Sequence, residues 1–190
     1  DSGDTIPYNF RIRTNCVTGM IFSPHIDFEY HYNEKWGWGL GVFVRPLSQN
    51  YKLLGPPDFQ LNGYGGFADW IYFKPTYRNR YFTFALRCGY RYLYGYAQTG
   101  NIYSPDFKTN RIRQDIVTAW RFSYVIPSNK YLINFDWYFT VGLRTSFYRT
   151  TFSPQHPGQD RNYNADFGYP QNGCYVLPEF VGGLEFGFGW

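Results

Sequence analysis

The sequence contains no long hydrophobic run, and histidine and cysteine are scarce. No segment of the 190 residues approaches the roughly 18 consecutive apolar residues that a transmembrane helix needs, which excludes a helical membrane protein. The three cysteines, Cys16, Cys88 and Cys174, are far apart and match neither a CxxC motif nor a zinc-ligand spacing. We expect them to be isolated side chains, with a disulfide between two loop bases as the alternative.

Positive charge is not concentrated anywhere in the chain. The net charge is +4 and the pI is about 8.9, but the basic residues are spread singly and form no block. A nucleic-acid-binding surface needs a basic patch or stripe, so we expect no nucleic-acid partner. The first residues, Asp1 to Thr5, have neither the basic nor the apolar segment of a signal peptide. We therefore interpret the chain as an exported protein whose signal peptide has been removed.

Aromatic residues are abundant. The chain has 20 tyrosines, 19 phenylalanines and 6 tryptophans, 24% of all residues, although its mean hydropathy is only −0.46. The single core of a soluble domain of this size has little room for so many rings. A barrel wall that faces lipid, with aromatic girdles at both interfaces, accommodates them on its outside.

Apolar and polar residues alternate with the period of a β-strand in eight segments. They are 7–17, 25–33, 35–46, 67–78, 81–96, 111–126, 131–149 and 174–190. One face of each clear segment carries large rings, and the other carries charge and glycine. The interior of eight strands barely holds ordinary side chains, so the rings must point outward. The sequence predicts one domain, residues 1–190, with an all-β fold: an eight-stranded antiparallel up-and-down transmembrane β-barrel.

The connections between these segments alternate in length. Short links are expected at 33–35, near 79–80 and at 127–130, and long loops at about 18–24, 47–66, 97–110 and 150–173. Outer-membrane barrels have short periplasmic turns and longer external loops. The pattern therefore predicts the outer membrane of a Gram-negative bacterium, with both termini in the periplasm.

Pairing neighbouring strands predicts a network of charges inside the barrel. Its members are Arg11, Arg13, Asp27, Glu29, Arg121 and Asp136, with Arg11 opposite Glu29, Arg13 opposite Asp27 and Arg121 opposite Asp136. Gly37, Gly39 and Gly41 would face His31, Glu29 and Asp27 and leave room for long charged side chains. Further inward charges are expected at Arg45, Arg87, Arg91, Arg113, Asp115, Arg144, Glu179 and Glu185. A register slip of one residue would place every charge in lipid.

The last strand is amphipathic and ends on an aromatic residue. Phe186, Phe188 and Trp190 alternate with Glu185, Gly187 and Gly189. This ending resembles the C-terminal recognition signal of outer-membrane barrels, which implies the barrel-assembly machinery as a partner during insertion.

Two stretches resemble small outer-membrane barrels of Bacteroidota, many of which have no assigned activity. The first is RTNCVTGMIFSPHIDFEYHYNEKWGWGLGVFVRP, from Arg13, with an acidic second strand, a tight turn and a third strand of tryptophan and glycine. The second is FKPTYRNRYFTFALRCGYRY, from Phe73, with a strand containing proline followed by an aromatic one. The resemblance implies fold and location, with outer-membrane lipid and lipopolysaccharide as surroundings, and no mechanism.

Three functions are compatible with such a barrel. We expect a structural or accessory subunit beside a larger outer-membrane complex, without catalytic, cofactor-binding or metal-binding residues. The first alternative is a narrow channel for small solutes, although interdigitating charges would fill eight strands. The second is a lipid-A-modifying enzyme, with Ser23 and His25 near the outer rim, but no acid is evident in the sequence to orient the imidazole. Of the other histidines, His31 faces inward near Asp27 and Glu29, and His156 lies in the longest loop.

Overall fold

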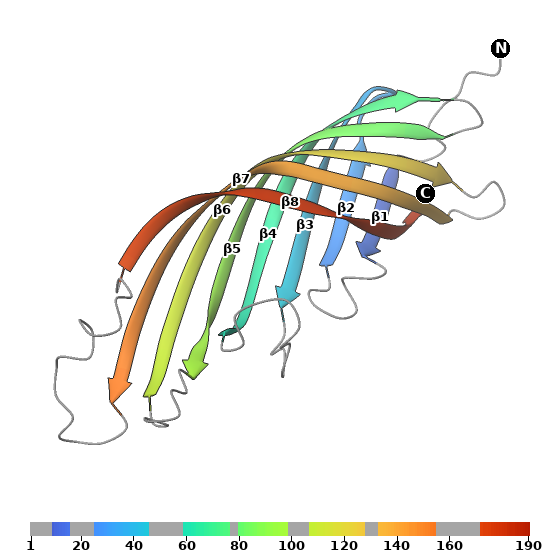
Figure 1. Cartoon of the computed structure of the whole chain (residues 1–190). Coiled ribbons are helices and arrows are strands. Elements are labelled where there is room, and N and C mark those ends of the chain that lie inside the picture. Colours follow the sequence, from blue (N-terminus) through green and yellow to red (C-terminus); the bar gives the residue numbers. More distant parts are fainter. Residues whose placement is uncertain are drawn as a thin grey trace, which may run out of the picture.

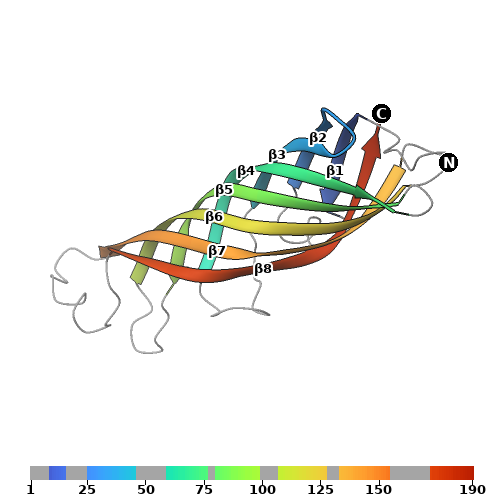
Figure 2. The same cartoon turned by 90° about the horizontal axis from the view of Figure 1, so that it is seen from above.

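The fold is a closed barrel of eight antiparallel strands (Figures 1 and 2). The computed structural model describes residues 9–15, 25–45, 59–76, 80–98, 107–127, 133–154 and 172–190. The strands are β1 (Phe10–Asn15), β2 (His25–His31), β3 (Trp36–Arg45), β4 (Phe59–Pro75), β5 (Tyr81–Gln98), β6 (Phe107–Pro127), β7 (Ile133–Pro154) and β8 (Asn172–Gly189). Each pairs with its chain neighbours, and β8 pairs with β1. In these residues no helix is long and apolar enough to cross a membrane.

The strands differ greatly in length. β1, β2 and β3 have 6, 7 and 10 residues, whereas β6 and β7 have 21 and 22. In Figure 1, β5 to β8 continue toward the lower left, beyond the ends of β1 and β2. One side of the barrel wall is therefore much taller than the other. We call the end of the barrel that carries the short β2–β3, β4–β5 and β6–β7 connections the tight turns, and the part of β5–β8 farther from it the upper wall.

The predicted loops are too long at three places. β4 starts at Phe59, inside the range 47–66, β6 starts at Phe107, inside 97–110, and β7 runs to Pro154, inside 150–173. The sequence there is mostly polar or rich in glycine and lacks a sustained row of large apolar residues. In the segment 108–111, for example, every residue is polar. Alternation of apolar and polar residues therefore cannot reveal these strand ends.

The predicted register is correct between the first three strands and wrong between β6 and β7. Arg11 pairs with Glu29 and Arg13 with Asp27, and the three glycines of β3 face β2 as expected. In contrast, Arg121 pairs with Thr140 on β7, four residues from the expected Asp136. An even shift leaves every side chain on its predicted face, so periodicity cannot detect it.

The barrel is polar inside and apolar outside. Arg11, Glu29, Asp136 and Glu185 are all 0% exposed in the interior, whereas Trp137 on the outer face is 60% exposed. Other outward rings with large exposed areas are Trp38, Trp70, Phe84, Trp120, Phe135 and Phe139. Cys88 and Cys174 are free, exposed cysteines, and Cys16 lies outside the described residues. This distribution is the reverse of that in a soluble barrel.

A small apolar cluster lies inside the barrel near the tight turns. It consists of Ile71, Phe73, Tyr81, Ala85 and Val125, all buried. The ring of Phe73 occupies the space in front of Gly37. A Cβ atom at position 37 would lie only 2.8 Å from a carbon of that ring. The glycine at position 37 thus makes room for an aromatic ring, and the expectation that it accommodates charged chains is wrong there.

Candidate functional site: the barrel interior

Arg13 is the centre of the interior charge network. Its guanidinium nitrogens lie near five carboxylates: 3.1 Å from Asp27, 3.2 Å from Glu29, 3.4 Å from Glu185, 3.5 Å from Asp69 and 3.8 Å from Asp136. These acids come from β2, β4, β7 and β8. Arg13 is only 2% exposed. One side chain of β1 therefore links four other strands across the barrel.

Arg11 and Arg121 complete the pairing of these acids. Arg11 contacts Asp136, and its Nε donates a hydrogen bond of 2.6 Å to Asn134. Arg121 contacts Glu185 and donates to Ser123 Oγ at 3.2 Å. The structure brings all six residues of the predicted network into the interior. The predicted pair Arg121–Asp136 does not form, because the β6–β7 register is shifted by four residues.

Asp69 of β4 is a network member that the sequence analysis missed. It accepts two hydrogen bonds from Arg87, from Nε at 2.8 Å and from Nη2 at 2.6 Å. Its inward neighbours along the strand are Phe67 and Ile71, so both faces of this strand are apolar in the sequence. The contrast between an outward face of apolar rings and an inward face of charges, which is clear on other strands, is therefore weak on β4.

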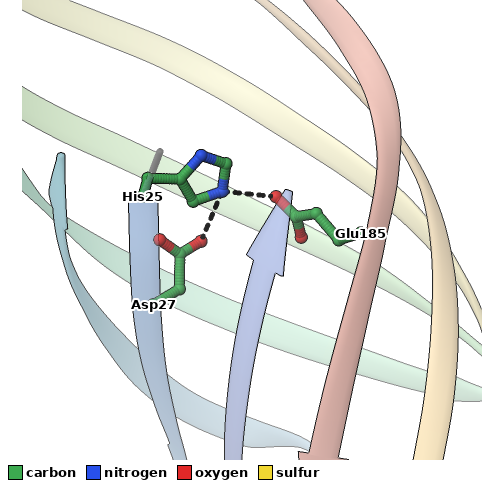
Figure 3. A group of neighbouring side chains, drawn as sticks. All are labelled: His25, Asp27 and Glu185. Atoms are coloured by element: carbon green, nitrogen blue, oxygen red, sulfur yellow. Dashed lines mark hydrogen bonds and ion pairs between the residues drawn. The ribbon is translucent and has the colours of Figure 1, made fainter. Parts of the chain in front are cut away.

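His25, Asp27 and Glu185 lie close together (Figure 3). Both carboxylates are also within ion-pair distance of Arg13. His25 Nε2 donates to Glu185 Oε1 at 3.1 Å and lies 3.8 Å from Asp27 Oδ2. One imidazole and two carboxylates form a ligand set that zinc and iron use. However, Arg13 Nε lies 3.1 Å from one carboxylate and 3.4 Å from the other. A fixed guanidinium thus already supplies the positive charge, and we interpret the group as part of the ion-pair network.

The structure also provides an acid for His25, which the sequence did not reveal. Glu185 is separated from His25 by 160 residues in the chain, and only closure of the barrel brings the two together. Ser23, the nucleophile of the enzyme alternative, lies outside the described residues, as does His156. His31 contacts Glu29 at 2.8 Å and packs against the ring of Phe73.

A second group of charges lies farther from the tight turns. Glu179 of β8 accepts hydrogen bonds from Arg91 at 2.6 Å and from Arg144 at 3.3 Å, and Arg113 donates to Asp115 at 3.0 Å. These arginines are 17–28% exposed, unlike Arg11, Arg13 and Arg121. The pairing is therefore less dehydrated here than around Arg13. The side chain of Arg45 lies outside the described residues.

A cavity of about 310 Å³ lies between the two charge groups. It is lined by Asn15, His25, Phe43, Gly66, Phe67, Arg87, Gly89, Arg91, Val117, Arg121, Tyr138, Thr140, Glu179 and Val181. These residues come from all eight strands. Toward the tight turns, the network around Arg13 and the apolar cluster fill the barrel below this cavity.

The chain ends at the seam of the barrel. The backbone oxygen of Trp190 accepts hydrogen bonds of 3.0 Å from the N–H groups of Asn9 and Phe10. Phe188 and Trp190 project outward and are 48% and 52% exposed, and Phe186 packs against Phe188. The three residues proposed as an assembly signal thus lie on the outer face at the end of the last strand, where Phe186 packs on Phe188 and Trp190 packs on Phe10.

Comparisons of this chain with protein-family models, with curated proteins and with solved structures find no match.

Proposed function

We propose that this protein is an integral outer-membrane β-barrel whose interior is closed near the tight turns, and that it acts as a structural or accessory subunit beside a larger outer-membrane complex. The observation that carries the proposal is the reversed polarity of the barrel. Large apolar rings are exposed on the outside, and ionised side chains are fully buried inside. In water such a surface would aggregate, whereas in a bilayer it is the stable arrangement.

The outward side chains change character along the tall strands. On β7 the outward residues from Phe135 to Leu143 are all apolar, and Thr145, Phe147 and Arg149 follow, of which only Phe147 is apolar. On β5 the outward Phe82, Phe84 and Leu86 are followed beyond Cys88 by tyrosines. A strand needs about 9–11 residues to cross a bilayer. We therefore place the part nearest the tight turns in the membrane, with those turns and both termini in the periplasm, and the upper wall outside.

The closed interior favours a subunit over a channel. A solute would have to displace the buried ion pairs around Arg13, and breaking a buried pair costs about 3–5 kcal/mol. Two surfaces remain for a function: the outward apolar side chains near the tight turns, such as Phe84 and Phe139, and the upper wall. Both are exposed on this chain and suit contact with a second membrane protein, in addition to lipid and lipopolysaccharide.

Extraction from the native membrane in mild detergent, followed by mass spectrometry, tests this proposal. We expect a larger outer-membrane protein to co-purify in a fixed ratio. A barrel that purifies alone with bulk lipid would refute the accessory role. Solute flux in liposomes or a changed mass of lipid A would then support the channel or the enzyme.

Two native cysteines allow the contact to be mapped. Cys88 lies on the outer face of β5 and Cys174 on that of β8, and both are exposed. In a Cys16→Ser background, Cys88→Ser and Cys174→Ser each leave one thiol for a maleimide photo-crosslinker. A specific partner should crosslink from one wall only. Equal labelling of many proteins from both positions would indicate random neighbours in the membrane.

A further inference from the structure

The interior cavity combines an apolar side with a polar side. Phe43, Phe67, Val117 and Val181 supply apolar surface, and Arg87, Arg91, Arg121 and Thr140 supply hydrogen-bond donors. Small-molecule sites in proteins have this composition: a mostly apolar lining with a few placed polar groups.

The side chains that line the cavity offer more free hydrogen-bond donors than free acceptors. Nη1 of Arg121 and Oγ1 of Thr140 are buried, and neither has a hydrogen-bond partner among the described residues. Arg91 reaches Glu179 through Nη2 alone. Glu179, the carboxylate in the lining, already accepts on both oxygens, from Arg91 and from Arg144. The polar side of the cavity is thus suited to an anion that accepts several hydrogen bonds.

Two guanidinium groups are fixed by rings of the same cavity. That of Arg87 lies 3.5 Å from the centre of the Phe67 ring, and that of Arg121 lies 4.3 Å from the centre of the Tyr138 ring. Such cation–π contacts restrict the side chains before any ligand is present. Less conformational freedom is then lost on binding, which favours affinity.

The size and the surroundings of the cavity limit the ligand. About 310 Å³ is at the lower end of the range for small-molecule sites, roughly 300–1,000 Å³, and is too small for a lipid with several acyl chains. Val181 and Leu177 of β8 face the interior but are 39% and 38% exposed. Within the described residues, β1 pairs with β8 only between Glu185 and Gly189. The apolar side of the cavity thus includes a side chain, that of Val181, which is partly exposed.

We propose that the cavity binds a small amphiphilic carboxylate. The carboxylate accepts hydrogen bonds from Arg91, Arg121 and Thr140, and a single short alkyl chain lies along the apolar side chains. This inference does not depend on the accessory role. A barrel that binds the ligand but purifies without a protein partner would refute only the proposed function.

The test uses tritiated decanoate and the whole barrel held in amphipol, measured by scintillation proximity. We expect saturable binding of one decanoate per barrel, which unlabelled decanoate displaces. Decanol and decyltrimethylammonium have the same chain without the negative charge, and we expect neither to compete. Binding that does not saturate, or that decanol displaces equally well, would overturn the proposal, because it would show apolar partition alone.

Two arginines on the same glutamate provide a matched pair of variants. Arg91 lines the cavity, whereas Arg144 binds Glu179 from outside the lining. We expect Arg91→Gln to weaken decanoate binding about tenfold or more, the effect of losing a charge-assisted hydrogen bond. Arg144→Gln should change it less than about threefold, since only a partly screened charge is lost. Equal effects of the two substitutions would contradict the assigned position of the carboxylate.

A third variant tests the apolar side. Val181→Trp places a large ring in the cavity at a position that is already 39% exposed, so there is open space beside it for part of the ring. We expect it to abolish saturable binding. The shift in gel mobility on heating verifies that every variant is folded. A folded Val181→Trp barrel that binds decanoate as tightly as the wild type would place the ligand elsewhere and refute the site.

Discussion

Replacing Arg13 by methionine tests the charge network most directly. The substitution keeps an unbranched side chain and so leaves no large cavity, but it removes the cation that lies 3.1–3.8 Å from five carboxylates. Removing one partner of a buried ion pair destabilises a protein by about 3–5 kcal/mol. Because Arg13 serves five acids, we expect a loss at the upper end of this range, about 5 kcal/mol.

The free energy of unfolding is measured by urea titration of the barrel in lipid vesicles, with the fluorescence of the six tryptophans as the signal. Arg13→Lys is the control for charge. It retains the positive charge without the planar fork, and we expect an intermediate loss. Asp27→Asn in the Arg13→Met background removes one of the carboxylates that lost this cation and should restore part of the stability, with a coupling of about 0.5–3 kcal/mol.

A loss below about 1 kcal/mol for Arg13→Met would refute the reasoning. That value is typical of exposed ion pairs. It would mean that water reaches these carboxylates, and that the interior near the tight turns is not closed.

Three further predictions concern the wall, the packing and the end of the chain. Phe139→Arg, on the outer face of β7 within the proposed membrane span, should lower the free energy of unfolding in vesicles by about 2–4 kcal/mol. Phe147→Arg, farther along the same face, should lower it by less than about 1 kcal/mol. Equal losses would argue against the bilayer position. Gly41→Val would press a side chain against the Phe67 ring and Asp27 and should cost about 1–3 kcal/mol in the same titration, whereas Gly182→Ala, whose Cβ would meet the backbone oxygen of Tyr138 at 3.3 Å as its nearest contact, should cost less. A tolerated valine would show that the ring can move away. Trp190→Ala should lower the amount of heat-modifiable barrel in cell membranes, since it removes part of the proposed assembly signal. Refolding in vesicles should be almost unchanged, because this side chain is 52% exposed. Unchanged insertion in cells would contradict the assembly signal.

The alternation of apolar and polar residues predicted the strands and their pairing best where one face of a strand is polar and the other is apolar. On β1 and β2 every inward residue from Arg11 to Asn15 and from Asp27 to His31 is polar. The short turn at Asn33, whose side chain accepts from the N–H groups of Lys35 and Trp36, fixes the β2–β3 register. A strong contrast and a tight turn are together sufficient to predict a pairing.

The features that the sequence did not predict depend on closure of the barrel, or lie where the two faces of a strand differ little in polarity. Arg13 was expected to pair with Asp27 on the adjacent strand, and its contacts with Asp69 and Asp136 cross the interior. No pairing of neighbouring strands reveals such contacts. The shifted β6–β7 register escaped prediction because an even displacement preserves both faces. Asp69 was missed because its inward neighbours are apolar.

The tall strands have a consequence for motion. In the proposed position, one continuous hydrogen-bonded ladder of β6 and β7 passes from hydrocarbon into water. Lipid cannot hydrogen-bond to an opened amide, so the ladder within the bilayer stays closed. Outside the bilayer, water can replace each broken bond, and local opening costs far less free energy. Amide protons at the two ends of a single strand should therefore exchange at very different rates, and the upper wall can fray and re-form while its base stays fixed.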